Sequence, residues 1–241
     1  MAETKEDKKA DVGQMFDSIA FRYDFLNHFL SFGVDYLWRR KAIRIIGRSF
    51  RNPAILDVAT GTCDLAIAAM KIEPVKVTGI DISEKMLAIG QQKIDKKGLG
   101  HKILLQKGRS EELPFEDGTY DVAMVAFGVR NFADPLKGLS EMCRVVRNNG
   151  MIMVLEFSRP QTFPFRQIYY FYFRRILPYI GRMFSKSNNA YTYLHDTVMK
   201  FPDNERFLEL LRSAGFTNVK QKRLTGGIAS IYTGIKTKHN N

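Results

Sequence analysis

The sequence is short of the residues that a disulfide-bonded, zinc-binding or membrane-spanning protein requires. Its 241 residues include only two cysteines, Cys63 and Cys143, too few for a disulfide framework or a four-ligand zinc site. No apolar run approaches the ~20 residues of a membrane-spanning helix. The mixed-charge first ten residues also lack the apolar core of a secretory signal. We therefore expect a protein of the reducing cytoplasm that has no metal site.

Acidic residues are scarce relative to basic ones, and the imbalance predicts an anionic partner. The 37 lysines and arginines exceed the 25 acids, for a net charge of +12. No acid occurs between residues 157 and 195, where basic side chains alternate with aromatic rings. The basic ones are Arg159, Arg166, Arg174, Arg175, Arg182 and Lys186. This mixture is typical of a surface that contacts anionic lipid or single-stranded nucleic acid. Alternatively, the aromatic residues form a stripe that simply packs on the core.

From residue 53 onward, short apolar runs alternate with helix-like segments. Strands are predicted at 54–58, 75–80, 103–106, 121–126 and 151–156, and helices at 64–70, 84–97 and 136–146. Single helices between strands imply a parallel sheet with right-handed crossovers. A helix from about 202 to 215 and two strands, 219–224 and 228–235, complete an α/β fold. This fold has a seven-strand, mostly parallel sheet with one reversed strand and helices on both faces.

The same pattern predicts one domain with two additions. Residues 1–13 are expected to be a flexible lead-in to a single domain over 14–241. Helical spacing before the first strand predicts a helical cap over 14–52, lying above the ligand site. The aromatic and basic stretch is expected to be an insertion over 157–200. The sequence leaves the oligomeric state open.

The most informative segment is a small-residue turn between a strand and a helix, in residues 55–65 (ILDVATGTCDL). A second apolar run ends on Asp81, about 20 positions after Gly61, the spacing of a nucleotide-type site. The acids Asp57 and Asp64 flank the turn, and carboxylates there would repel a pyrophosphate. They would attract an ammonium and a sulfonium, so the turn predicts S-adenosylmethionine, with Asp81 binding the ribose. Helix capping alone is the simpler explanation of Asp64.

At this point the chain resembles the class I S-adenosylmethionine-dependent methyltransferases, whose sheet is Rossmann-like. From about residue 16 it is similar to the menaquinone/ubiquinone C-methyltransferase family. The matching motifs are 16–20 (FDSIA), 23–27 (YDFLN), 31–33 (SFG) with Trp38 and Arg39, 56–65, 112–117 (ELPFED), 127–131 (FGVRN), and 144–147 (RVVR) with Gly150 and 155–158 (LEFS). The order and spacing of these motifs make the resemblance specific.

The resemblance implies methylation of a ring carbon in demethylmenaquinol, giving menaquinol, or in the related benzoquinol. Asp57, Gly61, Thr62, Asp81, Arg109 and Ser110 would then bind the cofactor. Arg130 would stabilise a phenolate oxygen beside the transferred methyl, with Asn131 orienting the same oxygen. A surface or ion-pairing arginine is the alternative for Arg130. His195 and Asp196 are weaker candidates for a base, and Tyr23 and Trp38 would pack on cofactor, substrate or core.

The chain also departs from the family pattern at several positions. Cys63 stands where a glycine is usual, which predicts less room beside the cofactor. Asp35 replaces a histidine and so removes a possible acid–base group. Arg109 replaces an acceptor for the adenine amino group, and an arginine accepts no hydrogen bond. It would therefore stack on the adenine and leave the hydrogen bonding to the Ser110 backbone. Asn148 and Asn149 replace a proline-glycine pair and only alter a turn.

A membrane-resident quinol gives the basic, aromatic insertion a role in transient contact with the inner face of the cell membrane. No nucleic-acid partner is then expected. An RNA or other small-molecule methyltransferase is the main alternative, and copurifying nucleic acid rather than lipid or quinone would favour it. A binding subunit without enzymatic activity is the other alternative, and failure to bind S-adenosylmethionine would favour that.

Overall fold

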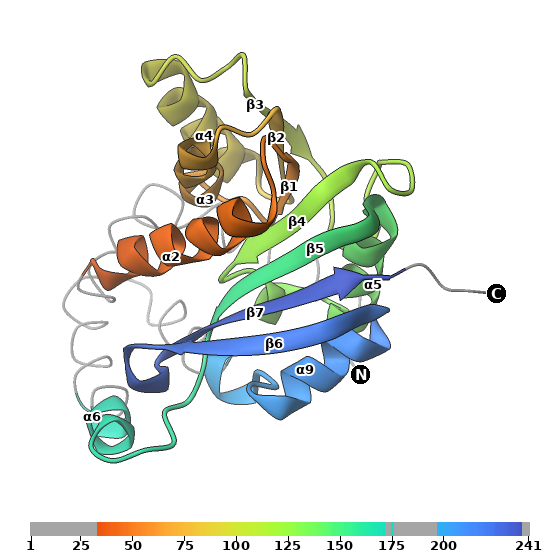
Figure 1. The fold of residues 1–241 in the computed structure, drawn as a ribbon. Helices are drawn as coiled ribbons and strands as arrows, with labels where there is room; N and C mark the ends of the chain where they lie inside the picture. The colour runs from red at the N-terminus through yellow and green to blue at the C-terminus, as the bar shows by residue number, and fades with distance from the viewer. Residues whose placement is uncertain (1–32, 172–174, 176–196, 238–241) are drawn as a thin grey trace, which may run out of the picture.

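Short runs of aliphatic and β-branched residues form the strands, which join in one seven-stranded sheet (Figure 1). The computed structural model describes residues 33–171, 175 and 197–237. The strands are β1 (Ala54–Val58), β2 (Lys76–Asp81), β3 (Ile103–Lys107), β4 (Tyr120–Ala126), β5 (Val146–Phe157), β6 (Phe216–Leu224) and β7 (Ala229–Lys236). Their order is β3-β2-β1-β4-β5-β7-β6, and β7 runs antiparallel to the other six strands. The predicted seven-strand sheet with one reversed strand is confirmed.

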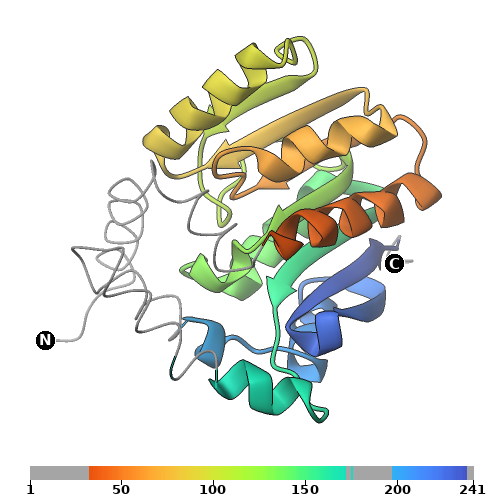
Figure 2. The same cartoon turned by 90° about the vertical axis from the view of Figure 1, so that its left-hand side faces the viewer.

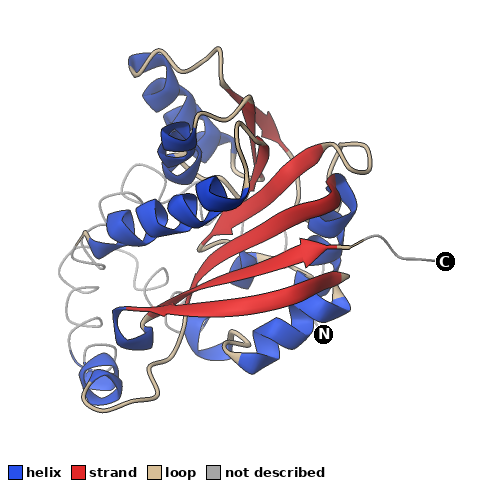
Figure 3. Ribbon diagram, viewed as in Figure 1, coloured by secondary structure: helices blue, strands red, loops and turns tan. Residues whose placement is uncertain are grey.

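Helices cover both faces of the sheet (Figure 3). One face carries α2 (Val34–Ser49), α3 (Asp64–Ala69) and α4 (Glu84–Lys96), which Figure 2 shows side by side in front of the strands. The other face carries α5 (Pro135–Val145) and α9 (Glu205–Ser213). Successive side chains of β5 alternate between the two cores, with Val154 on the α5 side and Leu155 on the α2 side. The central strands are therefore mostly apolar, as expected for parallel strands buried on both faces.

The predicted strand ends differ from the observed ones mainly at β5. The sequence predicts this strand from residue 151, whereas it begins at Val146, directly after α5 ends at Val145. The register with β4 shifts between Tyr120 and Val122, and Asn149 lies in the left-handed region with φ +62°. The two asparagines therefore lie in an irregular start of the strand rather than in a turn before it.

Helix α2 is the part of the predicted cap that the structure describes. Its buried residues Trp38, Ala42, Ile43 and Ile46 pack into the core on one face of the sheet. The Trp38 Nε1–H also donates to Thr225 Oγ1 at 2.8 Å, and Thr225 begins the short 3₁₀ helix η4 (Thr225–Gly227) between β6 and β7. Residues 14–32, and with them Tyr23, lie outside the described residues. The cap over 14–52 therefore stays a prediction.

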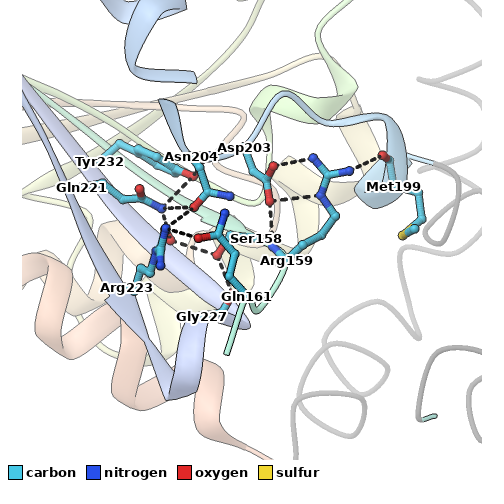
Figure 4. Close-up of polar contacts among 11 residues, drawn as sticks. Ser158, Arg159, Gln161, Met199, Asp203, Asn204, Gln221, Arg223, Gly227 and Tyr232 are labelled. Atoms are coloured by element: carbon cyan, nitrogen blue, oxygen red, sulfur yellow. Dashed lines mark hydrogen bonds and ion pairs between the residues drawn. The ribbon is translucent and has the colours of Figure 1, made fainter. Parts of the chain in front are cut away.

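The two ends of the predicted insertion are tied together by polar contacts (Figure 4). Arg159, just after β5, donates from its backbone N to Asp203 Oδ2 at 2.8 Å and from Nη2 to Oδ1 at 2.5 Å. Asn204 and Tyr232 continue the contacts toward β7, with 3.0 Å between the Asn204 N and the Tyr232 hydroxyl. Between these ends the structure describes α6 (Phe165–Phe171). Arg174, Arg182, Lys186, His195 and Asp196 lie outside the described residues.

Candidate active site

Three of the predicted site residues, together with Glu156, lie at the carboxyl ends of four neighbouring parallel strands. Asp81 ends β2, Asp57 lies near the end of β1, Arg130 follows β4, and Glu156 lies near the end of β5. The chain runs outward from β1 toward β3 on one side and toward β5 on the other. The space between β1 and β4 is therefore the topological switch point, where ligands bind in open α/β sheets.

Asp81 holds the turn after β1, which we call the cofactor turn (residues 59–64). Its Oδ2 accepts the Gly61 backbone N–H at 2.8 Å, and its Oδ1 accepts that of Ser83 at 2.9 Å. Gly61 adopts φ +55°, and a Cβ placed on it would meet no atom within 4 Å. This turn therefore leaves open space at a position where the backbone conformation itself favours glycine.

Asp57 lies beneath the same turn and is 1% exposed. Its Oδ2 accepts the Thr60 hydroxyl at 2.6 Å. Burial raises the pKa of this carboxyl to about 7, against a lowering by the Thr60 hydrogen bond. A cation beside the turn would favour the charged form of this carboxyl.

Asp64 contributes less to the charge of the site than the sequence suggests. Lys93 on α4 reaches Asp64 Oδ1 at 2.7 Å and donates to Thr62 Oγ1 at 2.9 Å. Thr62 is 3% exposed and is therefore linked through its hydroxyl to α4. The electrostatic attraction for a cationic ligand consequently depends on Asp57 and Asp81.

Cys63 does not narrow the space beside the cofactor turn, and that prediction is wrong. Its side chain is fully buried within the core under α4. A Cβ on Gly90 would lie only 2.3 Å from the Cys63 sulfur, so the sulfur occupies the space that Gly90 leaves. Cys63 itself adopts φ +69°, a conformation that explains why glycine is usual in such a turn.

Arg109 and Ser110 follow β3, in a loop held in place from α5. Arg109 is exposed, and its backbone forms an isolated antiparallel β-bridge with that of Glu112, while Ser110 is half-buried. Arg144 on α5 donates to the carbonyls of Leu113 at 2.9 Å and Phe115 at 2.7 Å. The motifs 112–117 and 144–147, separate in the sequence, therefore meet in space and fix the loop that carries Arg109 and Ser110.

Arg130 lies in η2 (Val129–Asn131). Gly128, which precedes η2, packs against the cofactor turn. A Cβ on Gly128 would lie 2.7 Å from the Ala59 Cβ, so the turns after β1 and β4 touch at this point. Ala59 and Phe127 adopt φ +52° and +57°. Left-handed conformations in residues other than glycine cost energy and gather at functional sites, which agrees with a site between these two turns.

Arg130 is paired with Glu156, a residue that the sequence analysis missed. Its Nη1 donates to Glu156 Oε1 at 2.5 Å, and the two side chains are 5% and 0% exposed. The guanidinium lies over the Phe157 ring, with 5.4 Å from Cζ to the ring centroid. Arg130 is thus an ion-pairing arginine, buried at the end of β4 rather than on the surface. An acid ending an otherwise apolar strand was the signal that could have identified Glu156.

The neighbouring residues complete the end of the sheet. Asn131 Nδ2 donates to the Phe127 carbonyl at 3.4 Å and so closes its own turn. The Trp38 ring centroid lies 6.2 Å from those of Phe127 and Phe157. Asp35, where the family usually has histidine, is buried and forms an ion pair with Arg39 one helical turn later.

Comparison with known proteins identifies the family. The model of the ubiE/COQ5 methyltransferase family matches residues 1–236. The chain belongs to this family. The ubiquinone/menaquinone biosynthesis C-methyltransferase UbiE of Geotalea uraniireducens is 44% identical over 232 residues, covering 95% of this chain and 98% of that protein. The demethylmenaquinone methyltransferase of Bacteroides fragilis is 44% identical over 230 residues, covering 95% and 94%.

Solved structures agree with this membership at the level of the fold. A possible histamine N-methyltransferase from Thermotoga maritima has a TM-score of 0.64 at 21% identity, covering 94% of this chain and 100% of that one. The [4+2]-cyclase SpnF has a TM-score of 0.67 at 16% identity, covering 94% and 95%. Because these two proteins differ in reaction, the fold alone does not fix the chemistry. Membership in the ubiE/COQ5 family makes the chain a methyltransferase.

Proposed function

We propose that this methyltransferase transfers the methyl group of S-adenosylmethionine to a ring carbon of demethylmenaquinol, giving menaquinol. The observation that carries the proposal is the buried Arg130, which lies in the turn after β4 whose Gly128 packs against the cofactor turn. The printed names of the relatives, demethylmenaquinone methyltransferase and UbiE, support the substrate class.

The residues around the cofactor turn fit S-adenosylmethionine. Gly61 offers open space above the turn, and the carboxylates of Asp57 and Asp81 suit a ligand with an ammonium and a sulfonium. Asp81 would bind the ribose hydroxyls, while Gly61 and Thr62 hold the turn beneath the ligand. Arg109, exposed in the loop after β3, would stack on the adenine, with the Ser110 backbone beside it. When bound, the cofactor supplies the electrophilic methyl group.

The protein's own part is to hold the quinol ring and stabilise negative charge on its oxygen. A ring carbon becomes nucleophilic when a neighbouring hydroxyl loses its proton. Arg130 would stabilise that oxyanion, and Asn131 would hold the turn that carries Arg130. Much of the rate would come from keeping carbon and methyl at ~3–3.5 Å. The Phe127, Phe157 and Trp38 rings would exclude water from the reacting atoms.

Contact with a membrane surface would deliver a substrate with a prenyl tail. Phe163, Phe165 and Phe171 are 80%, 40% and 62% exposed around α6, beside the exposed Arg166. Exposed rings next to cations are typical of surfaces that enter the lipid headgroup region. None of the helices in the described residues has the length and apolar character needed to cross a membrane.

The test is an assay of the purified protein with S-adenosylmethionine and demethylmenaquinol in vesicles containing anionic lipid. We expect a quinol heavier by one CH2, identified by mass spectrometry. A protein that methylates only the benzoquinol, or only RNA, would refute the proposed substrate. Replacing Phe163 and Phe171 with serine should weaken vesicle binding without affecting S-adenosylmethionine affinity; unchanged vesicle binding would refute the membrane contact.

A further inference from the structure

The Arg130–Glu156 pair leaves two polar atoms unsatisfied inside the protein. In the part of the chain that the structure describes, Glu156 Oε2 and Arg130 Nε are buried and have no hydrogen-bond partner. Glu156 Oε1, in contrast, is fully used, because it accepts from Arg130 Nη1 at 2.5 Å and from the Phe157 backbone N–H at 2.9 Å. Buried polar atoms without partners cost stability and are rare in native proteins. Such a pair of atoms therefore points to a ligand that supplies the missing bonds.

The chemistry of the two atoms restricts that ligand. Arg130 Nε carries a hydrogen to donate, and the Glu156 carboxylate can only accept. A hydroxyl group suits such a pair of side chains, because its oxygen can accept from a guanidinium while its hydrogen is donated to the carboxylate. The ion pair already joins the two side chains, so a hydroxyl that donates to Glu156 Oε2 would lie beside the Arg130 guanidinium. This geometry occurs at the carboxyl ends of β4 and β5, beside the cofactor turn.

We propose that Glu156 Oε2 takes the proton from the ring hydroxyl next to the carbon that is methylated, while the Arg130 guanidinium holds that oxygen. This inference rests on the proposed function, and it supplies the general base that the sequence did not identify. A base among the candidates of the sequence analysis, such as His195, is then not required.

The groups around Glu156 favour this role. Burial raises the pKa of its carboxyl, against a lowering by Arg130, and so brings it closer to the ~10 of a phenol. Among the described residues, Tyr232 on β7 and Tyr169 on α6 are further titratable groups that interact with the pair. Burial raises the pKa of both phenols, that of Tyr232 to about 12, so both stay neutral. The adjacent Asp203 is itself compensated by Arg159.

The proton and electron balance closes without any further reactant. The O–H bond breaks and its proton moves to Glu156 Oε2, while the oxygen's electrons shift into the ring. The ring carbon forms a bond to the methyl group, and the S–CH3 bond breaks with its electron pair remaining on sulfur. The methylated carbon then loses its own hydrogen to water, and Glu156 returns its proton to the oxygen. One proton is released to solvent for each methyl group transferred.

Glu156→Gln is the variant that tests the proposal, because glutamine keeps an oxygen for Arg130 and the Phe157 N–H but cannot take a proton. We expect kcat at pH 7 to fall about 10²-fold or more, with the calorimetric Kd for S-adenosylmethionine unchanged. The deficit should shrink as pH rises toward the pKa of the quinol, since hydroxide then removes the proton. Asp203→Asn, which also removes a buried carboxylate paired with arginine, is the matched control and should keep the wild-type pH profile.

The outcomes separate this inference from the proposed function. Wild-type protein that does not methylate demethylmenaquinol refutes the proposed function. Wild-type methylation with a Glu156→Gln variant of near-normal kcat, or with a deficit that is constant across pH, refutes only the role of Glu156.

A second measurement on the wild-type protein applies if Glu156→Gln does not fold. Menaquinol and its two mono-O-methyl ethers are compared as ligands, none of them a substrate because the ring carbon is already methylated. The ether of the hydroxyl next to that carbon cannot donate to Glu156, so we expect its Kd to be at least tenfold weaker than that of menaquinol. The ether of the far hydroxyl should bind like menaquinol. Equal affinity of the two ethers would overturn the proposal.

Discussion

The contact between the turns after β1 and β4 allows a sharp test of how the site is assembled. In Gly128→Ala the new Cβ would lie 2.7 Å from the Ala59 Cβ and 2.9 Å from Val125 Cγ2. Gly128 has φ −107°, so alanine causes no backbone strain and its whole cost comes from crowding. Overpacking of this kind costs about 1–3 kcal/mol of unfolding free energy. Displacement of Arg130 from the cofactor turn should also lower kcat by ~10-fold or more.

The second substitution, Ala59→Gly, removes the atom that the new methyl group meets. Glycine also suits the φ of +52° at this position, so the single Ala59→Gly change should alter stability little. In the double variant we expect most of the lost stability and activity to return, with a coupling of about 1 kcal/mol or more. Gly100→Ala, where a Cβ meets nothing within 4 Å, is the matched control.

Urea unfolding followed by tryptophan fluorescence measures these effects directly. The chain has a single tryptophan, Trp38, whose ring lies beside Phe127 at the end of β4. If the cost in the double variant equals the sum of the two single costs within ~0.5 kcal/mol, the turns after β1 and β4 do not touch.

Three further predictions concern the cofactor turn and the loop beside it. Burial raises the pKa of Asp57 from 3.8 to about 7. Its contribution to the free energy of unfolding is therefore present below pH 4 and lost as pH rises through 7. Urea unfolding of Asp57→Asn should show a flatter dependence of stability on pH between 4 and 7. Arg144→Met should cost about 2 kcal/mol and weaken S-adenosylmethionine binding in calorimetry, because the loop carrying Ser110 loses its hydrogen bonds; unchanged affinity would contradict that link. Cys63→Gly should lower the melting temperature through a core cavity but leave cofactor affinity unchanged, and tighter binding would show that the sulfur does face the ligand.

Most of the fold follows from local patterns in the sequence. The strand and helix positions from β1 to β7 agree with the predictions to within a few residues, because burial on both faces produces continuous apolar runs that turns interrupt. The start of β5 at Val146 was not predictable in this way. Val146 pairs with Tyr120 of β4, but pairing resumes only at Met151 and Asn149 has φ +62°. The strand therefore extends back across an irregular stretch that no local sequence pattern indicates.

The cofactor turn and Asp81 were determined by the sequence, because a strand, a small-residue turn and an acid at fixed spacing depend only on the local chain. The ion pairs that neutralise the charged residues of the site depend on the tertiary structure. Lys93 reaches Asp64 across 29 positions, and Arg130 reaches Glu156 across 26. No periodicity connects residues so far apart; parallel strands and their crossovers bring them together at one end of the sheet. The packing of segments distant in the sequence also places the Cys63 side chain against Gly90 and Glu156 beside Arg130, which the sequence had already indicated.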